Sequence, residues 1–129
     1  MITFRNPQSV HDPVASYRHQ AEISGQVRWL VLSGQIGKDQ NSSVPEDPIR
    51  QLEIAMDNII ANLKTANMRV EHLVKLVFYL VGDSDPQKRR EVIAEKLNGH
   101  VPCTTLLFVA GLAAPSLKVE IDAWACCDC

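Results

Sequence analysis

The stretch GHVPCTTLLFVAGLAAPSLKVEIDAWA, residues 99–125, decides how the rest of the chain is interpreted. It predicts two strands, at residues 104–110 and 117–125, separated by the loop GLAAPS. In the second strand Val119, Ile121 and Ala123 alternate with Glu120 and Asp122. Successive side chains of a strand point to opposite faces, so one face is apolar and the other is acidic. The acidic face raises the question of whether the strand forms the wall of a functional site.

Two helices are predicted upstream of this stretch. Asp47-Pro48 and Asp85-Pro86 each combine a capping residue with a proline suited to the first helical position. The first helix presents apolar residues at spacings of three and four: Ile49, Leu52, Met56, Ile59, Ile60 and Leu63. The second helix carries a shorter apolar stripe and is expected to stop at Gly99.

Further strands are predicted before and between the helices. HQAEIS (19–24) and RWLVLS (28–33) flank a glycine-containing turn, which is typical of a hairpin, and residues 2–4 add a short N-terminal strand. Residues 34–48 are expected to form one surface loop. LVKLVFYLV (73–81) is almost continuously apolar and predicts a strand buried on both faces.

The predicted order is β-β-α-β-α-β-β, an α+β sandwich with two helices packed on one face of a mixed sheet. Two helices can cover only one face of that sheet. The other face must meet something else, and self-association is the simplest solution.

Size and composition place the chain among ordinary soluble proteins. Its 129 residues are enough for one domain, spanning 1–129, with its own core. The net charge of −2 gives no attraction to nucleic acid or to an anionic membrane surface. No apolar segment approaches the roughly 20 residues that span a bilayer, and the N-terminus lacks the apolar core of a signal peptide. We expect a cytoplasmic protein.

The four cysteines indicate neither a disulfide framework nor a zinc site. Three of them crowd into the tail CCDC, residues 126–129, and the fourth is Cys103. A disulfide framework spreads its cysteines along the chain, and zinc sites usually need two separated pairs of ligands. We expect a frayed strand end with free thiols, and no metal or cofactor.

Five segments, in the right order, resemble the RidA proteins, also called the YjgF or endoribonuclease L-PSP family. They are Tyr17, the turn SGQI (33–36), MDNIIANLKTAN (56–67), LVKLVFYL (73–80) and KVEIDAWA (118–125). The resemblance covers essentially the whole chain. It implies a chorismate-mutase-like α+β subunit, a homotrimer, and three small-molecule clefts between subunits.

The resemblance breaks at one position that matters for activity. Active members carry Pro-Ala-Arg-Ser or Pro-Ala-Arg-Thr, whose arginine clamps the carboxylate of a 2-imino acid while a glutamate positions the attacking water. This chain has Pro102, Cys103, Thr104 and Thr105 in that segment, and Glu120 matches the glutamate. A threonine hydroxyl cannot reproduce two parallel charge-assisted bonds. Losing such a contact costs roughly 2–5 kcal/mol, so 2-imino acid deamination is not expected here.

Each candidate residue has a plainer alternative. Arg18 could replace the lost cation or simply be a solvated side chain. Cys103 could be a nucleophile, but it stands where the family has alanine and suits a small packing role. Ser33 could line a cleft or only begin a turn, and Glu120 could face a cleft or solvent. The four histidines show no metal-ligand spacing.

The sequence therefore predicts a homotrimer whose intersubunit cleft binds a small polar metabolite. If the protein is an enzyme, we expect it to hydrolyse or deaminate an imine, enamine or related C–N bond. Glu120 is the candidate catalytic residue. The candidate binding residues are Tyr17, Ser33, Cys103, Thr104 and Thr105. The alternative is a non-catalytic binding or regulatory trimer. Ribonuclease activity ranks last, because the sequence offers no basic patch and no evident acid–base histidine pair.

Overall fold

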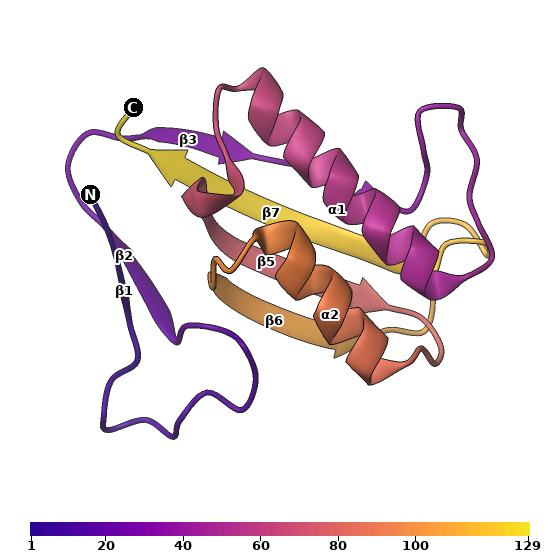
Figure 1. Ribbon diagram of the computed structural model, residues 1–129, viewed down its shortest axis with the longest axis horizontal. Coiled ribbons are helices and arrows are strands. Elements are labelled where there is room, and N and C mark those ends of the chain that lie inside the picture. Colours follow the sequence, from indigo (N-terminus) through magenta and orange to yellow (C-terminus); the bar gives the residue numbers. More distant parts are fainter.

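Two helices lie side by side over one face of a five-stranded sheet, and a separate two-stranded hairpin stands beside it (Figure 1). The computed structural model describes residues 1–129. The elements are β1 Ile2–Arg5, β2 Gln20–Ile23, β3 Arg28–Val31, β4 Gln35–Ile36, α1 Pro48–Thr65, the 3₁₀ turn η1 Val70–His72, β5 Leu73–Leu80, α2 Pro86–Leu97, β6 Cys103–Phe108 and β7 Val119–Cys127. Neither helix combines the length and the apolar content needed to cross a bilayer.

Both helices begin where the sequence predicts. The Asp47 carboxylate accepts a 2.9 Å hydrogen bond from the Ile49 N–H, and Asp85 caps α2 in the same way. Each cap satisfies backbone donors that have no partner within the helix. Helix α2 ends through two residues in the left-handed region, Asn98 (φ 52°) and Gly99 (φ 84°). The predicted helix stop at Gly99 is confirmed, and the left-handed backbone that ends the helix begins one residue earlier, at Asn98.

The main sheet is mixed, with the strand order β3-β7-β5-β6 and with β4 also paired to β7. Strands β5 and β6 run parallel, whereas β7 is antiparallel to both β5 and β3. The β5-α2-β6 segment is a crossover unit, which places β6 parallel to β5 at the sheet edge. The two strands of residues 99–125 are therefore not a ribbon, because β5 lies between them.

The predicted hairpin of residues 19–24 and 28–33 is wrong in its pairing. Both strands exist, but β2 pairs with β1, with Ile2 opposite Ile23, and β3 pairs with β7, with Arg28 opposite Cys127. Apolar alternation and a turn identify strands without naming their partners. The predicted surface loop 34–48 also contains a strand, β4, whose pairing with β7 begins at Gln35.

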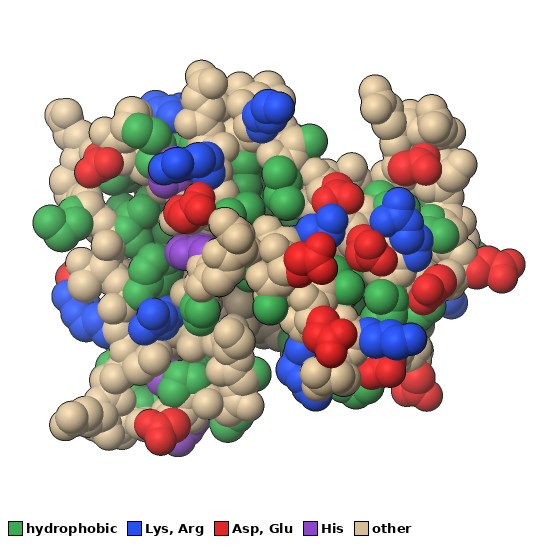
Figure 2. All heavy atoms as spheres, viewed as in Figure 1, with side chains coloured by type: hydrophobic (Ala, Val, Ile, Leu, Met, Phe, Trp, Pro, Cys, Tyr) green, Lys and Arg blue, Asp and Glu red, His purple; other side chains and the backbone are tan.

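The core lies between the sheet and the helices. Along β5, buried Leu76, Phe78 and Leu80 alternate with half-buried Val77 and Tyr79. The expectation that this strand is buried on both faces is wrong for the single chain, because both helices cover the same face. That is the face seen in Figure 2, where acidic and basic side chains are interspersed and form no large patch of one sign.

The uncovered sheet face exposes large apolar side chains beside the acidic Glu120 and Asp122 of β7. Trp29, Val31 and Leu107 are 52%, 63% and 42% exposed, and cross-strand register places all three on the face opposite the helices. Large exposed apolar side chains on an uncovered sheet face are a feature of contact surfaces. We call this surface the open face.

The end of β7 is neither frayed nor composed only of free thiols. Strand β7 continues through Cys126 and Cys127, both buried. Cys127 forms a disulfide with Cys129, and Cys103 and Cys126 keep free thiols. The expectation of a frayed end is wrong because pairing with β3 holds the end of β7 in place, and the expectation of free thiols in the tail holds only for Cys126.

Candidate functional site

A groove of about 410 Å³ lies between the β1-β2 hairpin and one end of the open face. It is lined by aromatic and aliphatic side chains with a few polar groups, a composition typical of small-molecule sites. Its lining includes His19, Ile23, Trp29, Lys75, Cys103 and Trp124. They come from β2, β3, β5, β6, β7 and the segment before β2.

Lys75 is the cation of this groove. Its Nζ donates a 2.8 Å hydrogen bond to the Thr105 hydroxyl, and Lys75 pairs with Cys103 across β5 and β6. Burial raises the pKa of the Cys103 thiol, and the nearby Lys75 ammonium opposes that shift. Cys103 therefore stays a neutral thiol at pH 7, which favours the packing role over the nucleophilic one. Lys75 was not among the predicted site residues, although a lysine interrupting an apolar strand was the available signal.

Tyr17 belongs to the same end of the molecule. The Arg18 N–H donates a 3.1 Å hydrogen bond to the Pro102 carbonyl, which fixes this segment against the start of β6. The Tyr17 ring meets His19 edge-on at 5.4 Å between centroids, and His19 meets His11 at 4.9 Å. No local sequence pattern predicts this histidine pair, because it depends on how residues 6–19 fold back.

Glu120 and the SGQI turn meet at a different place on the open face. The Glu120 carboxylate packs directly over Gly34, so that any Cβ at position 34 would overlap it. The approach follows from β4, whose pairing with β7 places Ile36 opposite Glu120. Ser33, the first residue of the turn, is exposed. The structure thus brings together Ser33, Gly34 and Glu120, which we call the Glu120 cluster.

A tyrosine and a second acid adjoin this cluster. The Tyr79 hydroxyl donates a 2.8 Å hydrogen bond to Asp122 Oδ2. This bond, burial and the charges of Asp122 and Glu120 together raise the pKa of Tyr79. Tyr79 stays protonated at neutral pH, so it acts as a hydrogen-bond donor beside two carboxylates.

Thr104 does not share the face of Glu120 within one chain. Thr104 pairs with Leu76, whose side chain points to the helices. Its neighbours Cys103 and Thr105 pair with Lys75 and Val77 and lie on the open face. Thr104 is half-buried rather than enclosed. Strand β6 is at the edge of the sheet, so groups on both of its faces can border an incoming molecule.

The predicted site residues therefore form two groups in one chain. Tyr17, Cys103 and Thr105 lie at or beside the groove, whereas Ser33 belongs to the Glu120 cluster. Across β5, Cys103 pairs with Lys75 and Glu120 pairs with Tyr79. Four residues of strand separate those positions, which is about 13 Å. No single cleft of one chain holds every predicted residue.

Comparisons with known proteins agree with this architecture. The family model described as Endoribonuclease L-PSP matches residues 8–127. The RutC family protein UK114 of Drosophila melanogaster is 32% identical over 112 residues, which cover 85% of this chain and 78% of that protein.

Two solved structures extend the comparison. YyfB of Yersinia pestis, a member of the conserved Rid protein family, is 26% identical with a TM-score of 0.84, and the match covers 98% of each chain. Rv2704 of Mycobacterium tuberculosis, from the YjgF/YER057c/UK114 family, is 25% identical with a TM-score of 0.66, covering 97% of this chain and 98% of that one. The family model, the shared sequence and the shared fold together establish that this chain belongs to the RidA/YjgF family, also named endoribonuclease L-PSP.

Proposed function

We propose that the protein is a homotrimer whose intersubunit clefts bind a small polar metabolite and hydrolyse an imine, enamine or related C–N bond. The large apolar side chains of the open face support association, because the 52% and 63% exposure of Trp29 and Val31 is costly in a monomer. Family membership supports the same assembly, since the RidA resemblance implies a trimer.

The observation that carries the proposal is the separation of Glu120 from the groove. Within one chain about 13 Å of β5 lies between the positions opposite Cys103 and Glu120, while both belong to the open face. A neighbouring subunit docked on that face would bring its own groove or sheet edge near Glu120. The cleft would then be complete only between subunits.

Glu120 would orient the attacking water in this cleft. Its carboxylate is held over Gly34 and can accept a hydrogen bond from water. Backbone N–H groups on the free edge of β6, near residues 103–105, would stabilise the charge that develops on the polarised nitrogen or oxygen. Tyr79 adds a neutral donor beside the acids.

The substrate need not carry a 2-carboxylate. Thr104 stands in place of the family's arginine, and Lys75 is a single point charge that cannot form the two-pronged bond of a guanidinium. Lys75 lies in the groove and donates to the Thr105 hydroxyl. It would attract a partial or single negative charge on the ligand.

Ammonia release from freshly generated 2-aminoacrylate and 2-iminobutanoate tests the proposal. We expect no acceleration by the wild type, acceleration by Thr104→Arg, and loss of that gain in Thr104→Arg/Glu120→Gln. Acceleration by the wild type would show that another cation holds the carboxylate and that our interpretation of Thr104 is wrong. If neither the wild type nor Thr104→Arg accelerates ammonia release, and a ligand raises the Tm, the non-catalytic binding alternative is favoured.

RNA cleavage has one observation in its favour, the His11–His19 pair. One ring nitrogen of each histidine is hydrogen-bonded to a main-chain carbonyl, of Asp12 and of His11 respectively, and the chain has a net charge of −2. These features weaken any phosphate contact, so this function stays last. Salt-sensitive RNA binding that disappears in His19→Ala would reverse that ranking.

A further inference from the structure

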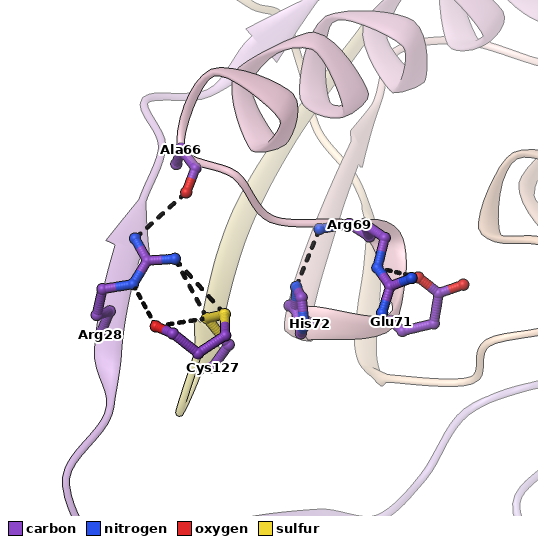
Figure 3. The surroundings of a disulfide bond; sticks show 7 residues. Arg28, Ala66, Arg69, Glu71, His72 and Cys127 are labelled. Carbon is purple, nitrogen blue, oxygen red and sulfur yellow. Dashed lines mark hydrogen bonds and ion pairs between the residues drawn. A yellow bond between two sulfur atoms is a disulfide. The ribbon is translucent and has the colours of Figure 1, made fainter.

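The end of β7 carries a second group of reactive side chains. The disulfide of Cys127 and Cys129 lies beside the guanidinium of Arg28 (Figure 3). The Nη2 of Arg28 lies 3.4 Å from the Cys127 sulfur and 3.5 Å from the Cys129 sulfur, and it donates a hydrogen bond to each. Cys127 is buried, whereas Cys129 is exposed.

Main-chain contacts hold Arg28 in this position. Its Nε donates a 2.9 Å hydrogen bond to the Cys129 carbonyl, and its Nη1 donates a 3.2 Å bond to the Ala66 carbonyl after α1. None of the four ion pairs in the structure includes Arg28. A fixed positive charge therefore faces both sulfur atoms.

His72 completes the group without making it a metal site. One of its ring nitrogens lies within 4.8 Å of both sulfur atoms. Its Nδ1 accepts a 3.0 Å hydrogen bond from the Arg69 N–H, which assigns the proton of the neutral ring to Nε2. Neither nitrogen then offers a free lone pair, whereas a metal ligand needs one. The arrangement suits a hydrogen-bond donor near sulfur.

We propose that Cys127 and Cys129 form a thiol–disulfide exchange site for low-molecular-weight thiols and disulfides. Thiolates are the reactive species in this exchange, and a neighbouring cation favours them. Stabilising the reduced pair also makes the disulfide a stronger oxidant. Arg28 supplies that stabilisation, and the exposure of Cys129 supplies access.

The exchange proceeds in two balanced steps. The thiolate of a small thiol attacks the Cys129 sulfur, a mixed disulfide forms, and the electron pair of the Cys127–Cys129 bond leaves on the Cys127 sulfur beside Arg28. A second thiolate then attacks the external sulfur of the mixed disulfide and releases the small disulfide and the Cys129 thiolate. Two thiols have supplied two electrons, and their protons go to solvent.

Equilibration with glutathione buffers tests the site. A Cys126→Ala background leaves only two cysteines, 127 and 129, in the tryptic peptide after Lys118. Acid quenching, alkylation and mass spectrometry then report the oxidised fraction of the pair. We expect reversible oxidation in which Arg28→Met shifts the equilibrium about tenfold toward the disulfide, because the reduced form loses its cation.

Arg69→Met is the matched control. Arg69 lies near the same turn but pairs with Glu71 at 3.9 Å, and its backbone N–H to His72 survives the substitution. We expect it to leave the equilibrium unchanged. The proposal is overturned if the pair fails to exchange with glutathione, or if the two arginine variants behave alike. Protection of the reduced pair from alkylation by added Zn²⁺ would also overturn it in favour of a metal site.

Discussion

The Tyr79 hydroxyl donates a 2.8 Å hydrogen bond to Asp122 on the neighbouring strand, and Glu120 lies directly opposite Tyr79 in the same ladder. The candidate catalytic carboxylate thus stands beside a protonated tyrosine and a second acid.

Removing the Tyr79 hydroxyl should change how the free energy of unfolding depends on pH at high pH. The bond to Asp122 raises the pKa of Tyr79 above its ordinary value of 10.0. The folded state therefore holds this proton more tightly than the unfolded state. Its contribution to stability is complete below about pH 10 and is lost as pH rises through the folded-state pKa.

We expect the unfolding free energy of the wild type to fall more steeply above about pH 10 than that of Tyr79→Phe. Denaturant unfolding at a series of pH values measures this difference. The tyrosinate absorbance that the variant lacks should appear with a midpoint above 10.0. A midpoint at or below that value contradicts the prediction.

Adding a methyl group at Gly34 should displace Glu120. A Cβ at this position overlaps the carboxylate, which ends a flexible side chain and can move aside, so we expect Gly34→Ala to reorient Glu120 and to destabilise the fold by at most about 1 kcal/mol. Gly111→Ala is the control, since a Cβ there meets no atom within 4 Å. Thermal unfolding of both variants checks the difference. Gly34→Ala/Glu120→Ala should recover part of the loss, and equal stability of the two single variants would refute the contact.

Gln51 is the one buried polar side chain of the core, and its loss should be costly. Its Nε2 donates to the carbonyls of Pro45 and Ser116, at 2.8 and 2.9 Å, and its Oε1 accepts from the Lys118 N–H at 2.8 Å. Gln51→Leu leaves three main-chain groups unpaired, so we expect a loss of about 3 kcal/mol in urea unfolding.

Gln87→Leu is the matched control for Gln51→Leu. Gln87 is an exposed glutamine of α2, and we expect its substitution to change stability by less than about 0.5 kcal/mol. Comparable losses in the two variants would mean that the Gln51 network contributes nothing specific.

Two neighbouring leucines of β6 point to opposite faces of the sheet, so substituting each one tests one face. Leu107 is 42% exposed on the open face, and Leu106 is 40% exposed on the other. If the open face is the subunit interface, Leu107→Glu places a charge in it and should yield monomers, whereas Leu106→Glu should keep the trimer. Light scattering coupled to size-exclusion chromatography measures both. If the Leu107→Glu protein is still a trimer, the open face is not the subunit interface.

Local chemistry made much of the fold predictable. Asp47 and Asp85 begin the helices as expected, because capping is decided within one turn. The alternation around Glu120 predicted which face of β7 is buried, because side-chain direction in a strand has a period of two. Each of the family's motifs is also a contiguous stretch of sequence, so the motifs and their order could be recognised without a structure.

Strand partners and the grouping of site residues could not be predicted in this way. The sequence suggested that residues 19–24 pair with 28–33. In the structure β3 pairs with β7 instead, and β2 pairs with β1. The contact of Gly34 with Glu120 joins positions far apart in the chain. The same holds for Lys75 with Thr105, and for Arg28 with Cys127 and Cys129.

The sequence by itself determined the helices, every strand except β4, and the family; that Thr104 replaces the family's carboxylate-binding arginine stays a prediction. Each of these depends on residue identity and short-range spacing. Only the tertiary structure decided that Glu120 lies apart from the groove, that Lys75 is its cation, and that Arg28 faces a disulfide. Those relationships depend on which strands pair and in what register, and long-range pairing is set by the collective burial of apolar faces rather than by any local signal.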